Sequence, residues 1–227
     1  MIDVPARPHV FPFDPDRAAL LVIDMQNDFL HPDGFCCSMP DVDAATIERV
    51  RGIIPRVVRA IDWARGSGVD VVYTRESHAP DLSDVTASKR VRYENAGYPI
   101  GAPGKLGRYL IRGEKGCALI DEMRPAPGEQ EVDKPGQSAF YATDLADILR
   151  GKTSLLFAGV TTECCVLATY RQAADMGFFT LLLEDCCAAF DPREHQAAID
   201  VVLGENGAVG WVGRSDDLVA ATASGGK

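Results

Sequence analysis

The sequence predicts a three-layer α/β fold, a doubly wound sandwich in which helices cover both faces of a mainly parallel central sheet. Two observations lead to this prediction. Short apolar runs rich in Val, Leu and Ile recur along the 227 residues, and an amphipathic stretch follows each of them. Strands that are apolar on both faces are typical of buried parallel sheets, and their alternation with helices is typical of doubly wound folds. We expect a single domain over residues 1–227, with its core over about residues 14–212.

The apolar runs define the expected strands, and the amphipathic stretches define the expected helices. Strands are expected at residues 18–24, 69–74, 154–158 and 179–184, and a strand-like segment, EVDK, ends at Lys134. Helices are expected at residues 47–65, 143–149, 163–176 and 193–203. Pro55 lies inside the first of these helices, so we expect a kink or a fresh helix start there.

Residues 76–115 show no clear periodicity and contain much of the glycine and proline. Long stretches of this kind in compact domains are usually functional. We expect the segment to be either a lid over a site or an oligomer contact, and both alternatives fit the sequence.

The composition excludes several classes of partner. The formal net charge is −10, from 23 Lys and Arg against 33 Asp and Glu, and an acidic surface repels nucleic acids and anionic membranes. The longest apolar run, residues 18–23, is far shorter than the roughly 20 residues of a membrane-spanning helix. Residues 1–15 include Pro5, Pro8 and Pro12 and lack the apolar segment of a secretory signal. We therefore expect a cytoplasmic protein.

Six of the seven cysteines form adjacent pairs, namely Cys36-Cys37, Cys164-Cys165 and Cys186-Cys187. Adjacent cysteines rarely bridge each other, because the bond strains the peptide between them. No pair has the Cys-x₂-Cys spacing of a zinc site. We expect reduced thiols, of which at least one is reactive.

Polar residues just after each strand are the functional candidates, since ligands of doubly wound sheets bind beyond the carboxyl ends of the strands. Asp24 ends the first strand, Lys134 ends the EVDK segment, and Cys164 and Cys165 lie in the turn GVTTECCV after the strand at 154–158. The sequence therefore predicts that a carboxylate, an ammonium group and a thiol meet at one edge of the sheet.

These three groups together suit nucleophilic catalysis. A thiol at the first turn of a helix and close to a cation is expected to favour the thiolate. Lysine supplies the cation and steadies an oxyanion, while aspartate carries a proton to a leaving amine. Backbone N–H groups of Thr161 and Cys165 are candidates for an oxyanion hole. Taken singly, the residues have ordinary explanations as a turn cap, a surface lysine and a buried cysteine, so the prediction rests on their joint placement.

Three segments, IDMQNDF, DKPGQSAFYATDL and GVTTECCV, resemble the signature blocks of the isochorismatase-like cysteine hydrolases. The blocks occur in the same order, and the resemblance extends from about residue 14 to residue 211. It implies a Rossmann-like topology, catalytic roles for Asp24, Lys134 and Cys165, and no role for Cys164. It also implies a cis peptide bond before Thr161 and a homo-oligomer, often a tetramer.

Within that family, segments such as YTRESHAPDLSD and GRYLIRGEKG look most similar to the biuret and triuret hydrolases, which release ammonia from urea-like molecules. Those enzymes usually have lysine where this chain has Gln137, and a substrate-binding glutamine where it has Glu205. A glutamate only accepts hydrogen bonds, and its two oxygens match the paired N–H groups of an amidinium. We therefore expect guanylurea to be preferred, with Gln137 and Glu205 in contact with it and Phe29 and Phe35 as pocket walls.

The expected reaction is cleavage of a terminal ureido C–N bond through a Cys165 thioester, with release of ammonia. Biuret and triuret are alternative substrates. A ureidoacrylate-like acid or isochorismate is a further alternative, for which Arg75 or Arg92 offers a cationic anchor. A catalytically idle binding subunit on the same fold is the alternative from another class, and the intact set of three candidates argues against it.

No metal ion or other cofactor is expected. Family members that cleave nicotinamide hold a divalent ion with a histidine pair after the second strand, whereas His78 has no second histidine nearby. His9, His31 and His195 lack the spacing of metal ligands. The expected partners are a small-molecule substrate and further copies of the chain.

Overall fold

The computed structural model describes residues 1–224, which contain a seven-stranded sheet in the order β2-β11-β10-β9-β4-β5-β8. Every neighbouring pair is parallel except β2 and β11, which run antiparallel. The strands are β2 (Ala6–Arg7), β4 (Ala18–Ile23), β5 (Asp70–Glu76), β8 (Gln130–Lys134), β9 (Ser154–Val160), β10 (Phe179–Ala188) and β11 (Trp211–Gly213). The predicted mainly parallel α/β fold is confirmed.

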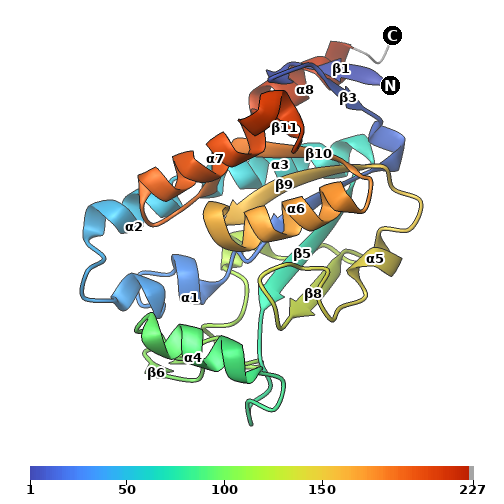
Figure 1. Cartoon of the computed structure of the whole chain (residues 1–227). Coiled ribbons are helices and arrows are strands. Elements are labelled where there is room, and N and C mark those ends of the chain that lie inside the picture. The colour runs from blue at the N-terminus through green and yellow to red at the C-terminus, as the bar shows by residue number, and fades with distance from the viewer. Residues whose placement is uncertain (225–227) are drawn as a thin grey trace.

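Helices cover both faces of this sheet, as Figure 1 shows. Alternate residues of β4 explain the two layers: Leu20 and Val22 belong to one apolar core with α3 and α8, whereas Leu21 and Ile23 belong to another with α6 and α7. Side chains of a strand point alternately to its two faces, so an all-apolar strand needs cover on both. The helices are α1 (Asn27–Leu30), α2 (Ala44–Arg51), α3 (Ile54–Ser67), α4 (Ala87–Asn95), α5 (Leu145–Ile148), α6 (Leu167–Asp175), α7 (Pro192–Gly207) and α8 (Ser215–Ser224).

Several expected elements differ in their bounds from the observed ones. The helix expected at 47–65 is divided into α2 and α3, and Pro55 lies in the first turn of α3, which confirms the alternative of a fresh helix start. The strands β5 and β10 continue to Glu76 and Ala188, beyond their expected ends. Both extensions are parts of the sheet: Glu76 pairs with Lys134 on β8, and Ala188 pairs with Val160 on β9.

The segment 76–115 has more regular structure than expected. It contains α4 and a small hairpin of β6 (Pro103–Gly104) and β7 (Gly107–Arg108). Outside this segment, a second two-stranded ribbon pairs β1 (Ile2–Val4) with β3 (Phe11–Phe13) at the other end of the molecule. Figure 1 shows α4 and β6 beside α1, beyond the lower ends of the strands. The segment therefore lies over the edge of the sheet that carries the predicted site.

Within residues 1–224, no helix is both long and apolar enough to cross a membrane. All seven cysteines lie in this part of the chain and are free thiols. Six of them are buried and Cys164 is half-buried. Cys186 and Cys187 are strand residues of β10, where their side chains fill the core.

Candidate active site

Asp24 follows β4 directly, with a left-handed backbone φ of 50° that aspartate tolerates better than most residues. The hydroxyl of Thr74 on β5 donates to Oδ1 of Asp24 at 2.6 Å, and the Asp24 N–H donates to the Thr74 carbonyl at 3.1 Å. The aspartate side chain is fully buried. The turn after β4 thus fixes a buried carboxylate at the carboxyl end of the strand.

Lys134 is the last residue of β8, and its side chain is also fully buried. Its Nζ lies 2.8 Å from Oδ2 of Asp24 and donates to the Gly136 carbonyl at 2.9 Å. A buried ammonium group is costly unless it is paired and hydrogen-bonded, and these contacts satisfy it. The alternative of an ordinary surface lysine is therefore wrong.

Cys165 lies in a π-helical turn, Thr162–Val166, between β9 and α6. Its Sγ is 3.3 Å from Nζ of Lys134. The chain enters this turn through a cis peptide bond between Val160 and Thr161, which the family resemblance implies. Short π-helical turns frequently occur at functional sites. The carboxylate, ammonium and thiol candidates therefore meet at one edge of the sheet.

A second carboxylate, that of Glu76 at the end of β5, belongs to the same cluster and is absent from the sequence-derived candidates. The Cys165 thiol donates to Oε2 of Glu76 at 3.4 Å, and Lys134 Nζ lies 3.7 Å from the same oxygen. The expected strand ends two residues early, at Thr74, which assigns Glu76 to the unclassified segment. A strand that is extended by two residues ends at Glu76, and the strand-end rule then includes Glu76 among the candidates.

Two residues of α4 hold Glu76 from the opposite side. Lys89 Nζ and the Tyr93 hydroxyl both lie 2.6 Å from its Oε1. They are four residues apart and so lie on one face of the helix. Lys89 also donates to the Pro135 carbonyl at 2.6 Å. These contacts tie the segment 76–115 to the cluster of candidate residues.

The cluster of Asp24, Glu76, Lys89 and Lys134 has a formal charge of zero while the thiol is protonated. Burial by itself raises the pKa of Glu76, but Lys134 and Lys89 outweigh burial and lower the pKa to about 2. Burial by itself lowers the pKa of Lys134, but its acidic neighbours, Asp24 foremost, raise the pKa above its usual range. Glu76 and Lys134 are therefore ionised at neutral pH.

The pKa of Cys165 lies well above the usual range of a thiol. Its hydrogen bond with Cys164 and its burial raise the pKa, and the neighbouring Lys134 ammonium does not compensate. Lys134 favours the thiolate, as expected, but the hydrogen bond with Cys164 and the burial of the thiol favour the protonated form more strongly in the free protein. A nucleophilic attack by Cys165 would therefore require its proton to move to another group.

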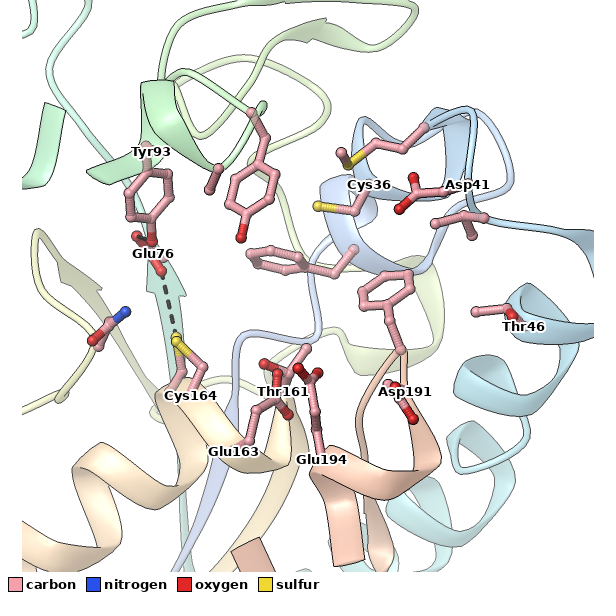
Figure 2. A pocket seen from close by; sticks show the side chains of 18 of the residues that line it. Cys36, Asp41, Thr46, Glu76, Tyr93, Thr161, Glu163, Cys164, Asp191 and Glu194 are labelled. Carbon is pink, nitrogen blue, oxygen red and sulfur yellow. Dashed lines mark hydrogen bonds between the residues drawn. The ribbon is translucent and has the colours of Figure 1, made fainter. Parts of the chain in front are cut away.

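A cavity of about 890 Å³ opens over Cys165. Figure 2 shows Glu76 and Tyr93 on one of its sides and the carboxylates of Glu163 and Glu194 close together on another. Carboxylates outnumber cations in its lining, which includes Asp41, Glu76, Glu163, Asp191 and Glu194 against Arg49 and Arg92. Aromatic rings complete the walls, namely Phe29, Tyr93, Tyr98, Tyr109 and Phe190.

Glu163 differs from the other carboxylates of the cavity. Its Oε2 is buried and has no hydrogen-bond partner among residues 1–224. Burial raises the pKa of this carboxyl. An unpaired buried acceptor is unfavourable, so a ligand that donates an N–H group there satisfies it.

The expected binding residues divide into two groups. Phe29, Gln137 and Thr161 line the cavity. Phe35 does not: its ring stacks on Tyr109 with centroids 4.4 Å apart and supports that wall from behind. The expectation that Phe35 is a wall residue is therefore wrong, and Tyr109 lines the cavity at this place instead.

Glu205 is not part of the cavity, and its expected contact with substrate is wrong. It is exposed, with a left-handed φ of 51°, in the last turn of α7. The helix starts beside the cavity at Pro192 and runs back to the edge of the sheet where β11 begins. A helix that connects two parallel strands runs antiparallel to them, so its two ends lie at opposite ends of the strands. Glu205 is therefore far from Cys165 and the cavity.

Two groups of residues bear on metal binding. The ligand atoms of Asp24, Glu76 and Cys165 lie within 4.8 Å of one another, and Lys134 Nζ is in contact with all three, so an ammonium group already supplies the cation. Both ring nitrogens of His78 are engaged, Nδ1 with Asp84 at 3.2 Å and Nε2 with Lys89 Nζ at 3.0 Å. Neither group fits a metal ion.

Known proteins share the fold over nearly the whole chain. A cysteine hydrolase from Pseudomonas syringae pv. phaseolicola has a TM-score of 0.78 at 23% identity, over 99% of this chain and 98% of that chain. An N-carbamoylsarcosine amidase from Thermoplasma acidophilum has a TM-score of 0.66 at 28% identity, over 88% of this chain and 97% of that chain. The first of these likenesses concerns the fold alone.

Sequence comparison extends this result. The ureidoacrylate amidohydrolase RutB of Agrobacterium fabrum is 30% identical over 220 residues, which cover 95% of this chain and 94% of the relative. The model of the isochorismatase domain matches residues 18–214. This match includes the sheet from β4 to β11 and the cluster of Asp24, Glu76, Lys134 and Cys165. The chain therefore belongs to the isochorismatase family.

Proposed function

We propose that the protein is an amidohydrolase that cleaves a terminal ureido C–N bond of a small nitrogen-rich compound and releases ammonia. One observation supports this proposal above the others: Lys134 Nζ bridges the Asp24 carboxylate, at 2.8 Å, and the Cys165 thiol, at 3.3 Å, beneath a cavity. A nucleophile, a cation and a proton carrier in direct contact are the parts that acyl transfer requires. The names of two relatives, a ureidoacrylate amidohydrolase and an N-carbamoylsarcosine amidase, support a carbamoyl nitrogen as the target.

The reaction begins when Sγ of Cys165 attacks the carbonyl carbon. As the S–C bond forms, the thiol proton passes to Asp24, whose carboxylate lies within 4.8 Å of the sulfur. The oxyanion is stabilised by Lys134 and by backbone N–H groups of Thr161 and Cys165, which line the cavity. Asp24 then gives the proton to the departing nitrogen, the C–N bond breaks, and ammonia leaves a thioester on Cys165.

Water completes the cycle. It attacks the thioester carbonyl while Asp24 takes a proton from it, the C–S bond breaks, and the proton returns to Sγ of Cys165. The products are a carbamic acid and the free thiol. Asp24 thus acts twice as base and twice as acid, a role that its fixed contacts with Thr74 and Lys134 suit.

The charge of the cavity supports a substrate rich in N–H groups and neutral or cationic at its far end. Four carboxylates other than Glu76 line the cavity, against Arg49 and Arg92, and Oε2 of Glu163 lacks a partner in the described chain. Carboxylate oxygens pair well with amidinium N–H groups. Guanylurea is therefore the proposed substrate, and biuret is its neutral analogue. In this proposal Glu163, and not Glu205, contacts the amidine group of guanylurea.

An acidic ureido substrate is a second candidate, supported by the ureidoacrylate amidohydrolase relatives. Of the two arginines expected as its anchor, Arg92 lines the cavity. Arg75 does not serve, because it forms ion pairs with Glu131 and Asp133 along β8. An acid would have to place its carboxylate beside Arg92 and away from Glu163 and Glu194.

Ammonia release from guanylurea, biuret, triuret and ureidoacrylate tests both candidates. We expect kcat/KM to be highest for guanylurea, and the Cys165→Ala variant to release no ammonia from any of them. A preference for ureidoacrylate would establish the second candidate instead. Hydrolysis that persists in Cys165→Ala, or no turnover of any ureido compound, would refute the proposed function.

We further propose a cytoplasmic location for this activity. The family resemblance supports a homo-oligomer, often a tetramer. Both remain proposals, which fractionation of cells and light scattering on the purified protein test.

A further inference from the structure

We propose that Glu76 is a positioning residue that keeps the thiol of Cys165 protonated and correctly oriented until substrate binds. The thiol donates its hydrogen to Oε2 of Glu76 at 3.4 Å and accepts from Lys134 Nζ at 3.3 Å, so two different strands, β5 and β8, contribute to its polar contacts. Asp24 is occupied by the Thr74 hydroxyl and Lys134. In the free protein the thiol proton therefore points to Glu76 and not to Asp24.

The contacts of Glu76 show that its carboxylate is held in one orientation. Its Oε1 receives Lys89 Nζ and the Tyr93 hydroxyl, both at 2.6 Å. Its backbone is fixed on both sides by the buried amide of Gln26, which accepts from the Glu76 N–H at 2.8 Å and donates to the Glu76 carbonyl at 3.0 Å. The side chain is 2% exposed. A carboxylate with this many partners can hold the sulfur without swinging away.

Charge balance explains why the proton stays on sulfur. The groups that face the thiol and Glu76 are Asp24, Cys164, Lys134, Lys89 and Tyr93, with His78 behind Lys89. Asp24 and Glu76 balance the two lysines, so a thiolate would leave the buried cluster with one uncompensated negative charge. A nearby negative charge disfavours ionisation of an acid. Without Glu76 the cluster would carry one positive charge, and the thiolate would become favourable.

A retained proton has a use in the reaction. The departing nitrogen needs a proton, and in the proposed mechanism this proton comes from the thiol through Asp24. If Cys165 lost its proton to solvent before the substrate bound, the buried site would lack the proton that the departing nitrogen needs. Asp24 is a proton carrier in this scheme, whereas Glu76 controls when the proton becomes available.

The test replaces Glu76 by Gln, which keeps the volume and removes the charge. The pH profile of iodoacetamide alkylation is followed at Cys165 by peptide fragmentation, which separates it from Cys164. We expect the alkylation midpoint to fall by about 1–2 pH units, and kcat on the proposed substrate to fall about 10- to 100-fold with little change in KM. Glu131→Gln on β8, whose exposed carboxylate pairs with Arg75, is the matched control and should change neither quantity.

Two further variants separate the charge of Glu76 from its shape. Glu76→Asp keeps the charge and should keep the alkylation midpoint close to that of the wild type. The double variant Glu76→Gln with Lys89→Met removes one charge of each sign, so its midpoint should return toward the wild-type value while kcat stays low. Circular dichroism verifies that each variant is folded.

An alkylation profile of Glu76→Gln that coincides with the wild-type profile would overturn the inference. A midpoint that falls but is not restored in the double variant would overturn the charge argument. The inference rests on the proposed function only in naming Cys165 as the nucleophile, and alkylation requires no substrate. Absence of ureido hydrolysis in the wild type would therefore refute the proposed function, while the alkylation profiles would still decide the role of Glu76.

Discussion

Nζ of Lys134 lies 3.3 Å from Sγ of Cys165, although β8 and β9 are separated in the sheet by β4 and β5. The lysine side chain is fully buried and lies near the carboxyl ends of β4 and β5. Its ammonium group also contacts the carboxylates of Asp24, which follows β4, and of Glu76, which ends β5. Four strands thus contribute to one charge-balanced cluster, and the chemistry of the thiol depends on all of them.

Replacing Lys134 by Met should reduce both activity and stability. Two buried carboxylates would lose their shared cation, and breaking a buried ion pair in this way costs about 3–5 kcal/mol. We expect kcat to fall by roughly 10³-fold or more, because oxyanion stabilisation is lost as well. Urea denaturation and ammonia release measure the two effects. Lys105→Met, at an exposed pair with Asp33, should leave both close to wild type, and a similar loss there would contradict the role of burial.

The covalent intermediate should form on Cys165. Rapid acid quenching during turnover of guanylurea, followed by mass spectrometry, is expected to show a thioester adduct on the peptide that contains Cys164 and Cys165. The adduct should be absent from Cys165→Ala and should persist in Cys164→Ser, since Cys164 has no contact with Lys134 that would activate it. An adduct carried by Cys164 alone would reassign the nucleophile.

Glu163 should determine the preference between cationic and neutral substrates. Glu163→Gln removes the negative charge of the carboxylate that carries the unpaired Oε2, and it keeps a polar side chain of similar size. We expect kcat/KM for guanylurea to fall about tenfold relative to that for biuret, which corresponds to one lost charge-assisted hydrogen bond. The comparable substitution Glu122→Gln, on the exposed turn Asp121–Met123, serves as the control. Equal losses for both substrates would show that Glu163 only shapes the cavity.

Asp28 should make the protein less stable as the pH rises from about 4 to about 6. Burial raises the pKa of this carboxyl to about 6 in the folded state, whereas an unfolded chain has the ordinary value near 4. The folded state therefore binds more protons in this interval, and the free energy of unfolding decreases as the proton is lost, by roughly 3 kcal/mol. Asp28→Asn, which still offers an oxygen to the Leu110 N–H, should abolish this slope. Urea denaturation at several pH values tests it, and an unchanged slope in the variant would assign the effect to another group.

Gly159 should not tolerate a side chain. Its φ is 128°, and an added Cβ would lie 2.0 Å from the carbonyl oxygen of Ile23, the residue before Asp24. Gly159→Ala must therefore separate β9 from β4 near the point where the two strands lead into Asp24 and the turn of Cys165. We expect a loss of several kcal/mol in unfolding free energy, of the order found for strained backbone and overpacked cores, together with greatly reduced kcat. Gly151→Ala is the comparison, because its φ is also positive, at 86°, but no atom lies within 4 Å of the added Cβ. A stability loss no larger than that of Gly151→Ala would refute the steric argument.

Local sequence signals predicted five of the seven strands of the main sheet and two of the candidate site residues, whereas the short edge strands β2 and β11 were not predicted. The all-apolar runs determine the buried strands, because only a strand covered on both faces can bury every side chain. The strand-end rule then selects Asp24 and Lys134, and the family resemblance chooses Cys165 over Cys164. Glu205 could not be placed in the same way, because its proposed contact depended on which end of a helix meets the site.

The order of residues by itself determined five strands of the main sheet, the helices α2, α3, α5, α6 and α7, and the chemical types delivered to one edge of the sheet, since these follow from hydrophobic periodicity and chain direction. Only the tertiary structure decided which charges share the buried cluster. Glu76, Lys89 and Tyr93 join it because β5 extends two residues further and α4 turns one face toward its end. Whether the thiol ionises depends on that sum of charges and on burial, which are properties of the folded arrangement and not of any single segment.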